Sequence, residues 1–135
     1  MKTTGHTGEW LSDGDTAIKV DRIWEYFISS RSSYSIYYLD YEIGNPTSSS
    51  QWVSGMEENY CYENFCQTQY SYLMEPKQLA LGSTMSNRGE IELEGPPDYI
   101  TIRFLNSIAN STYVIYPLPQ DREMPPEVKA YFEER

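Results

Sequence analysis

Apolar and polar residues alternate with a period of two along much of the chain, which is typical of half-buried β-strands. The clearest run covers residues 34–43 and reads "YSIYYLDYEI". One face of this run carries Tyr37, Leu39, Tyr41 and Ile43. The other face carries Asp40 and Glu42. The run ends at "GNPTSSS", where Pro46 cannot take part in a strand ladder.

Further stretches have the same character. They lie at residues 16–20, 23–29, 51–53, 90–94, 99–107 and 112–118. Residues 70–74 form a weaker strand candidate, and residues 75–89 read as a loop with room for one short strand. About seven short strands separated by turn-forming residues predict an all-β, Ig-like antiparallel β-sandwich. The side chains expected between its two sheets include Leu39, Tyr41, Ile102 and Phe104.

The two ends of the chain differ from this β-sandwich domain, which is expected to span residues 16–118. Residues 1–15 are polar and rich in Gly and Thr, which predicts a flexible N-terminal arm. Trp10 and Leu11 are exceptions to this polar character and are candidates for contact with the body. Residues 119–135 form a C-terminal tail of a different pattern.

The tail predicts a short amphipathic helix. Prolines stand at its start, and Val128, Tyr131 and Phe132 have the i, i+3, i+4 spacing of one helical stripe. So short a helix is marginal on its own. Its apolar stripe is therefore expected either to lie on the sandwich or to enter a groove on a partner.

The length of the chain predicts a single domain with one core. The chain has 135 residues, and aromatic residues make up 15% of it, including 13 Tyr, so they supply much of the core. No apolar run is long enough to span a membrane. The opening "MKTTGHTGEW" lacks the apolar segment of a signal peptide. Either the protein is intracellular, or a leader was removed and Met1 is not native.

The formal net charge of −10 limits the choice of partners. It argues against binding nucleic acid through the phosphates, which needs a basic face. It also disfavours anionic lipid surfaces. A basic protein partner remains compatible with this charge, and solubility alone is the simpler interpretation.

The two cysteines, Cys61 and Cys66, lie in "NYCYENFCQ". A structural zinc site needs four ligands, and His6 is the only histidine. A redox pair usually has the spacing C-x-x-C, whereas this one is C-x4-C. Two buried free thiols remain open. A disulfide that pins a β-hairpin or bulge fits best, and it implies the periplasm, the cell surface or the medium rather than the cytoplasm.

No catalytic constellation is evident in the sequence. His6 lies among Gly and Thr near the terminus, where nothing positions it as a general base. The three carboxylates of "EIELE" at residues 90–94 are typical of a solvated sheet face, and "DGD" at 13–15 lacks further calcium ligands at the right spacing. We therefore expect no enzyme activity, no metal and no cofactor. Asn110 begins a glycosylation sequon.

Aromatic side chains crowd the cysteine segment, where alternate members are expected to fill the core and the others to form a Tyr-rich contact surface. The candidate partner-binding residues are Tyr60, Tyr62 and Phe65, together with Val128, Tyr131 and Phe132 of the tail. The acidic neighbours Glu57, Glu58 and Glu63 would favour a basic partner.

The order of these pieces carries a resemblance. The strand and turn "YYLDYEIGNPTSSSQWV" precede the close pair "CYENFC", then "LALGSTMSNRGEIELEG", then "ITIRFLNSIANSTYVIYPL". Over about residues 16–118 this order resembles small Ig-like β-sandwich domains in surface and secreted proteins of Bacteroidetes-type bacteria. The resemblance implies a non-enzymatic spacer, adhesion module or subunit of a surface assembly. The C-terminal helix departs from that pattern and suggests docking onto a larger assembly.

Taken together, these features predict an exported, non-enzymatic accessory or structural module. It would bind another protein within a surface or extracellular assembly. The alternative is a small acidic inhibitor, an immunity or anti-defence protein, that blocks a basic effector. Oxidised cysteines favour the first interpretation, and free thiols with a native Met1 favour the second. The oligomeric state is left open by the sequence.

Overall fold

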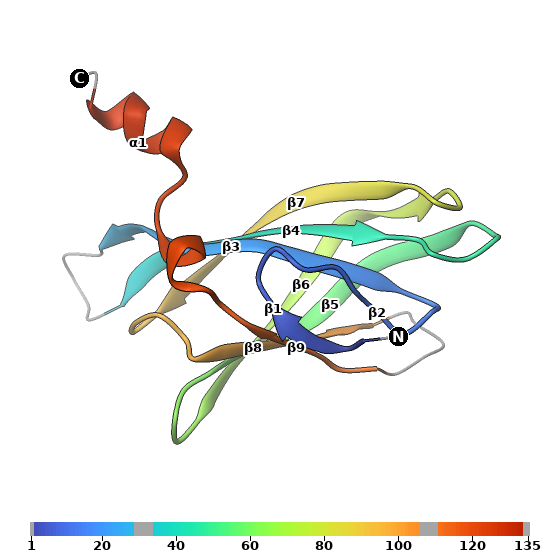
Figure 1. The fold of residues 1–135 in the computed structure, drawn as a ribbon, viewed down its shortest axis with the longest axis horizontal. Helices are drawn as coiled ribbons and strands as arrows, with labels where there is room; N and C mark the ends of the chain where they lie inside the picture. Colours follow the sequence, from blue (N-terminus) through green and yellow to red (C-terminus); the bar gives the residue numbers. More distant parts are fainter. Residues whose placement is uncertain (1, 29–33, 106–110, 134–135) are drawn as a thin grey trace.

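The computed structural model describes residues 2–28, 34–105 and 111–133, and it has two facing β-sheets (Figure 1). One sheet has the order β2-β3-β4-β7, with strands Leu11–Ser12, Ala17–Ile28, Ser35–Gly44 and Thr84–Leu93. The other has the order β1-β9-β8-β5-β6, with strands Thr4–His6, Tyr113–Tyr116, Tyr99–Phe104, Gln51–Cys61 and Cys66–Leu79. The prediction of an all-β, Ig-like sandwich is confirmed.

Seven of these strands, β3 to β9, form the body that the sequence pattern predicts. They pair antiparallel throughout, in the hairpins β3–β4, β5–β6 and β8–β9 and in the longer-range pairs β4–β7 and β5–β8. Within this body, the chain crosses from one sheet to the other after β4, β6 and β7. The two additional strands, β1 and β2, come from the N-terminal segment.

The N-terminal segment is part of the sandwich, so the prediction of a flexible arm is wrong for residues 2–15. Strand β1 runs parallel to β9, and β2 runs antiparallel to β3. Leu11 is buried in the core, whereas Trp10 stays partly exposed with the Lys19 ammonium 5.5 Å from its ring centroid. Backbone pairing at the sheet edges holds this polar segment, and strands of two and three residues leave no period-two pattern to detect.

Bulges explain why strand boundaries differ from the prediction. Strand β3 is continuous, but its pairing with β4 slips between Val20 and Arg22, so the alternation changes phase and resembles two strands. A slip between Val53 and Gly55 interrupts β5 in the same way. The loop expected at residues 75–89 is wrong, because β6 extends to Leu79 and β7 begins at Thr84. Only a tight turn separates them, in which Gly82 has φ +68°.

The space between the sheets is filled by apolar and aromatic side chains. The four residues predicted to lie there, Leu39, Tyr41, Ile102 and Phe104, are all buried. They belong to one continuous cluster that receives residues from both sheets. The assignment of inward faces from the period-two pattern is therefore confirmed for β4 and β8.

The tail has two parts that differ in how firmly they are held. A 3₁₀ turn, η1 (Pro119–Arg122), lies against β3, where Arg22 Nη1 donates to the carbonyl oxygens of Gln120 at 3.1 Å and Glu123 at 2.8 Å. Thr7 Oγ1 donates to Asp121 Oδ2 at 2.6 Å. The helix α1 (Pro126–Glu133) then stands out from the body, and none of its described residues is fully buried (Figure 1).

Candidate binding surface beneath the C-terminal helix

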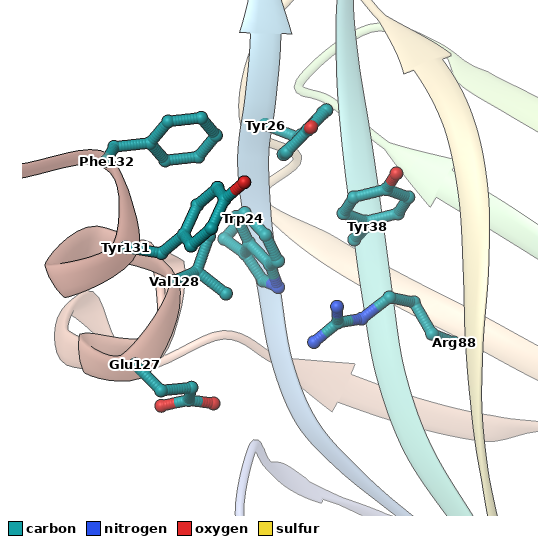
Figure 2. A pocket seen from close by; sticks show the side chains of 8 residues that line it. All are labelled: Trp24, Tyr26, Tyr38, Arg88, Glu127, Val128, Tyr131 and Phe132. Atoms are coloured by element: carbon teal, nitrogen blue, oxygen red, sulfur yellow. The ribbon is translucent and has the colours of Figure 1, made fainter. Parts of the chain in front are cut away.

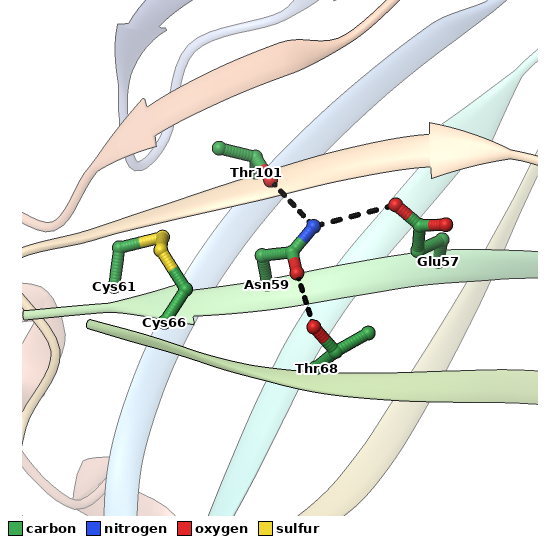
Figure 3. The surroundings of a disulfide bond; sticks show 6 residues. All are labelled: Glu57, Asn59, Cys61, Cys66, Thr68 and Thr101. Atoms are coloured by element: carbon green, nitrogen blue, oxygen red, sulfur yellow. Dashed lines mark hydrogen bonds between the residues drawn. A yellow bond between two sulfur atoms is a disulfide. The ribbon is translucent and has the colours of Figure 1, made fainter.

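The cysteine pair closes the β5–β6 hairpin. Cys61 and Cys66 face each other across the two strands and are joined by a disulfide, as predicted (Figure 3). Beyond them, Tyr62 N donates to the Phe65 carbonyl at 2.8 Å and so closes the turn. The Tyr62 and Phe65 rings stack with centroids 4.9 Å apart. The hairpin end is therefore a small rigid unit.

Only part of the predicted contact surface lies at this hairpin. Phe65 is 53% exposed, and Tyr62 is half-buried with its hydroxyl donating to the Gly95 carbonyl at 2.7 Å. The prediction that Tyr60 lies on the contact surface is wrong, because its side chain is fully buried between the sheets. It shares the inward face of β5 with Met56 and Glu58, since residues two apart on a strand lie on the same side.

The outer face beside the disulfide is bonded to itself. Asn59 Nδ2 donates to Thr101 Oγ1 at 3.1 Å, and Thr68 Oγ1 donates to Asn59 Oδ1 at 2.6 Å, which links β6, β5 and β8 (Figure 3). Arg103 Nη2 donates to Glu57 Oε2 at 2.8 Å. This ladder satisfies the polar groups of the face, so we interpret it as a structural feature.

Glu58 is a buried acid, contrary to the expectation of a surface charge for a basic partner. It is 1% exposed and accepts a hydrogen bond from the Tyr60 hydroxyl. Its Oε2 has no hydrogen-bond partner among the described residues. Burial raises the pKa of Glu58, and its interactions with the Ser71 and Tyr60 hydroxyls offset this only in part. Of the three acids expected at this surface, Glu57 is in an ion pair and Glu63 is exposed.

A cavity of about 350 Å³ lies between α1 and the outer face of the sheet β2-β3-β4-β7 (Figure 2). Four of its lining residues come from the sheet, and four come from the helix. They are Trp24 and Tyr26 of β3, Tyr38 of β4, Arg88 of β7, and Glu127, Val128, Tyr131 and Phe132 of α1. We call this space the aromatic cavity, because five of the eight residues carry aromatic rings.

Trp24 forms the floor of the aromatic cavity and is held firmly. It is fully buried although it lies on the outer face, opposite the inward-facing Ile23. Its Nε1 donates to Asp40 Oδ2 at 2.9 Å. The Arg88 guanidinium lies 5.2 Å from the Trp24 ring and 5.3 Å from the Tyr38 ring, and its Nη2 donates to Asp40 Oδ2 at 3.1 Å. The pKa of Arg88 is raised, chiefly by the hydrogen bond to Asp40.

The helix wall is only partly covered. Val128 is half-buried, whereas Tyr131 and Phe132 are 54% and 45% exposed. The Phe132 ring centroid lies 6.3 Å from that of Tyr26 and 5.5 Å from that of Tyr131. The structure therefore brings the three predicted tail residues together, and it adds a sheet wall that sequence analysis did not identify. The available signal was Trp24 and Tyr26 on one face of a strand whose opposite face already supplies the core.

The lining of the aromatic cavity is mainly aromatic, with one basic and one acidic side chain. The ionisable side chains that the structure places around the cavity are Arg88, Glu127 and the tyrosines Tyr26, Tyr38 and Tyr131.

Within the described ranges, no group of three or more His, Cys, Asp or Glu side chains could hold a metal ion. No helix there is long and apolar enough to cross a membrane. Asn110 of the glycosylation sequon lies outside the described residues.

Comparisons with known proteins support the fold alone. The chain is similar to the crystal structure of the yjhA protein from Bacillus subtilis, with 12% identity and a TM-score of 0.54, covering 84% of this chain and 99% of that one. It is also similar to the putative ApaA protein from Bordetella pertussis, with 12% identity, a TM-score of 0.50 and coverage of 84% and 98%. No protein-family model matches, and no curated protein sequence matches. The resemblance to Bacteroidetes-type surface domains stays a prediction.

Proposed function

We propose that this protein is a non-enzymatic, exported accessory module that binds another protein within a surface or extracellular assembly. The observation that carries this proposal is the aromatic cavity. Large aromatic side chains are held on both of its walls, yet Tyr131 and Phe132 remain about half exposed. Trp and Tyr are enriched among the residues that contribute most to binding energy at protein interfaces, and exposed apolar patches often mark such interfaces.

Export is supported by the disulfide. Cys61 and Cys66 are bonded, and bonds of this kind persist in oxidising compartments. A cytoplasmic protein would be expected to keep both thiols reduced. The pair therefore favours an exported module over an intracellular inhibitor.

Site-specific photo-crosslinking in the native host tests the proposal. p-Benzoylphenylalanine is placed at Phe132 in the aromatic cavity or, as a matched control, at Leu81, which is 60% exposed in the β6–β7 turn. We expect a discrete adduct with one envelope or secreted protein from position 132 and none from position 81. Equal adducts from both positions, or none from 132, would rule out this surface as the binding site.

The acidic inhibitor is retained as a second candidate because of one observation. Glu90, Glu92 and Glu94 are all exposed along and just beyond β7. Such a row, on a chain with a net charge of −10, could mimic a polyanion toward a basic effector. Subcellular fractionation separates the two candidates: recovery in the cytosol with alkylatable thiols supports the inhibitor, and recovery outside the cytosol with a blocked pair supports the accessory module.

A further inference from the structure

We infer that the aromatic cavity receives a cationic side chain, arginine or lysine, from a basic segment of the protein partner. This inference rests on the proposed function, and it specifies the chemistry of the same site. Three features of the cavity lead to it: its aromatic walls, a guanidinium that the walls already hold, and the sign of the surrounding charge.

The aromatic rings of the cavity already contact one cation, the guanidinium of Arg88. The Arg88 guanidinium lies within 6 Å of both the Trp24 and the Tyr38 ring centroids, which is the range of a cation–π interaction. The rings of Tyr26, Tyr131 and Phe132 line the remainder toward α1, and they offer the same kind of surface to a second cation (Figure 2).

The local charge favours a cation over an anion. Arg88 is compensated by Asp40, which bonds it through both carboxylate oxygens. Two more carboxylates act on the site: Glu127 lines the cavity, and Glu90 lies directly across from Tyr38 in the β4–β7 pair. Three carboxylates against one guanidinium leave a net negative site, so an incoming anion meets like charge and an incoming cation meets Glu127.

A blocked pentapeptide, Gly-Gly-Arg-Gly-Gly, and its citrulline counterpart test the inference on the full chain. Citrulline keeps the shape of arginine but lacks its charge. Binding is followed in ¹H–¹⁵N spectra through the indole N–H of Trp24, which forms the hydrogen bond to Asp40. We expect the arginine peptide to shift this signal and the backbone signals of α1, with a Kd at least about fivefold lower than that of the citrulline peptide.

Matched variants separate charge from shape. Glu127→Gln should raise the Kd of the arginine peptide about threefold and leave the Kd of the citrulline peptide unchanged. Glu133→Gln, at the end of the same helix, should change neither Kd. Phe132→Leu keeps an apolar side chain but removes an aromatic ring. This variant should therefore bind the two peptides with Kd values that differ by less than they do in the parent protein. Thermal unfolding of each variant confirms that the sandwich is intact.

Three outcomes would overturn the inference, and they treat the proposed function differently. Equal affinity for both peptides at the cavity makes it an uncharged pocket, in which case protein binding there still stands. Shifts confined to the hairpin around Tyr62 and Phe65 move the binding site away from α1, and protein binding again stands. No shift with either peptide, together with no adduct from position 132, removes both the inference and the proposed function.

Discussion

The two faces of the sheet β2-β3-β4-β7 both carry large apolar and aromatic side chains, but they differ in how completely these side chains are covered. The inner face presents Ile23, Leu39 and Tyr41 to the opposite sheet, and all three are buried. The outer face presents Trp24, Tyr26 and Tyr38 to α1, and there the cover is incomplete. Neighbouring residues of one strand, Ile23 and Trp24, thus belong to two different environments.

The difference shows that apolar content alone does not identify a core. The inner face is covered by the second sheet, and one continuous cluster of buried side chains joins the two sheets. Around the aromatic cavity the outer face is covered by an eight-residue helix, none of whose described residues is fully buried. We interpret the inner face as the main source of stability and the outer face as the surface at which we propose that a partner binds.

The largest expected effect lies between the sheets. Phe104→Ala removes a buried ring that packs edge-on against Tyr113, with centroids 6.1 Å apart, and should lower the free energy of unfolding by about 3–5 kcal/mol. Phe132→Ala, the matched aromatic truncation on the outer side, should cost less than about 1 kcal/mol. Urea unfolding measures both. Similar losses for the two variants would erase the distinction between the faces.

The hairpin disulfide should contribute less than the core. Replacing Cys61 and Cys66 together by Ser opens a short loop, for which chain entropy gives about 2 kcal/mol. The free energy of unfolding of the parent protein, measured in the absence and in the presence of reductant, gives an independent value for this contribution. A double variant as stable as the parent would show that strand pairing alone holds the hairpin, and would leave the disulfide without a structural role.

Glu58 is the weak point of the inner face. Its pKa is raised in the folded state, so its contribution to stability is present below about pH 4.5 and is lost as the pH rises through the folded-state pKa. Glu58→Gln keeps an acceptor for the Tyr60 hydroxyl without the buried charge. The variant should be more stable than the parent at pH 8, by about 1 kcal/mol, and the difference should shrink toward pH 4. A difference that does not change with pH would mean that Glu58 stays neutral or is solvated.

Much of the fold could be predicted from the sequence. The alternation in residues 34–43 and 99–104 identifies β4 and β8 and the side of each that faces the core. Bulges near Asp21 and Ser54 shift the phase of the pattern, which is why the sequence predicts two strands in place of β3 and a shorter β5. Strand β1 pairs with β9 from the other end of the chain, which no local pattern reports, and β2 is only two residues long although it pairs with the neighbouring β3.

Less of the candidate site could be predicted. The helical spacing of Val128, Tyr131 and Phe132 identified one wall, but the other wall depends on where the tail returns to the sheet. The crowding of aromatic and acidic residues around the cysteines predicts a surface position for Tyr60 and Glu58, whereas the phase of β5 after the bulge turns both side chains inward. Burial of an acid is decided by tertiary context that composition does not report.

Truncation of the tail after Met124 tests the central claim most directly, because it removes α1 and keeps η1 with its bonds to Arg22 and Thr7. The free energy of unfolding in urea is the quantity to measure, with truncation after Leu118, which also removes η1, as the comparison. The account predicts a loss below about 1 kcal/mol without α1 and a larger loss without η1. A loss of about 3 kcal/mol or more on removing α1 alone would contradict it, because the helix would then belong to the core and the outer face would not be free for a partner.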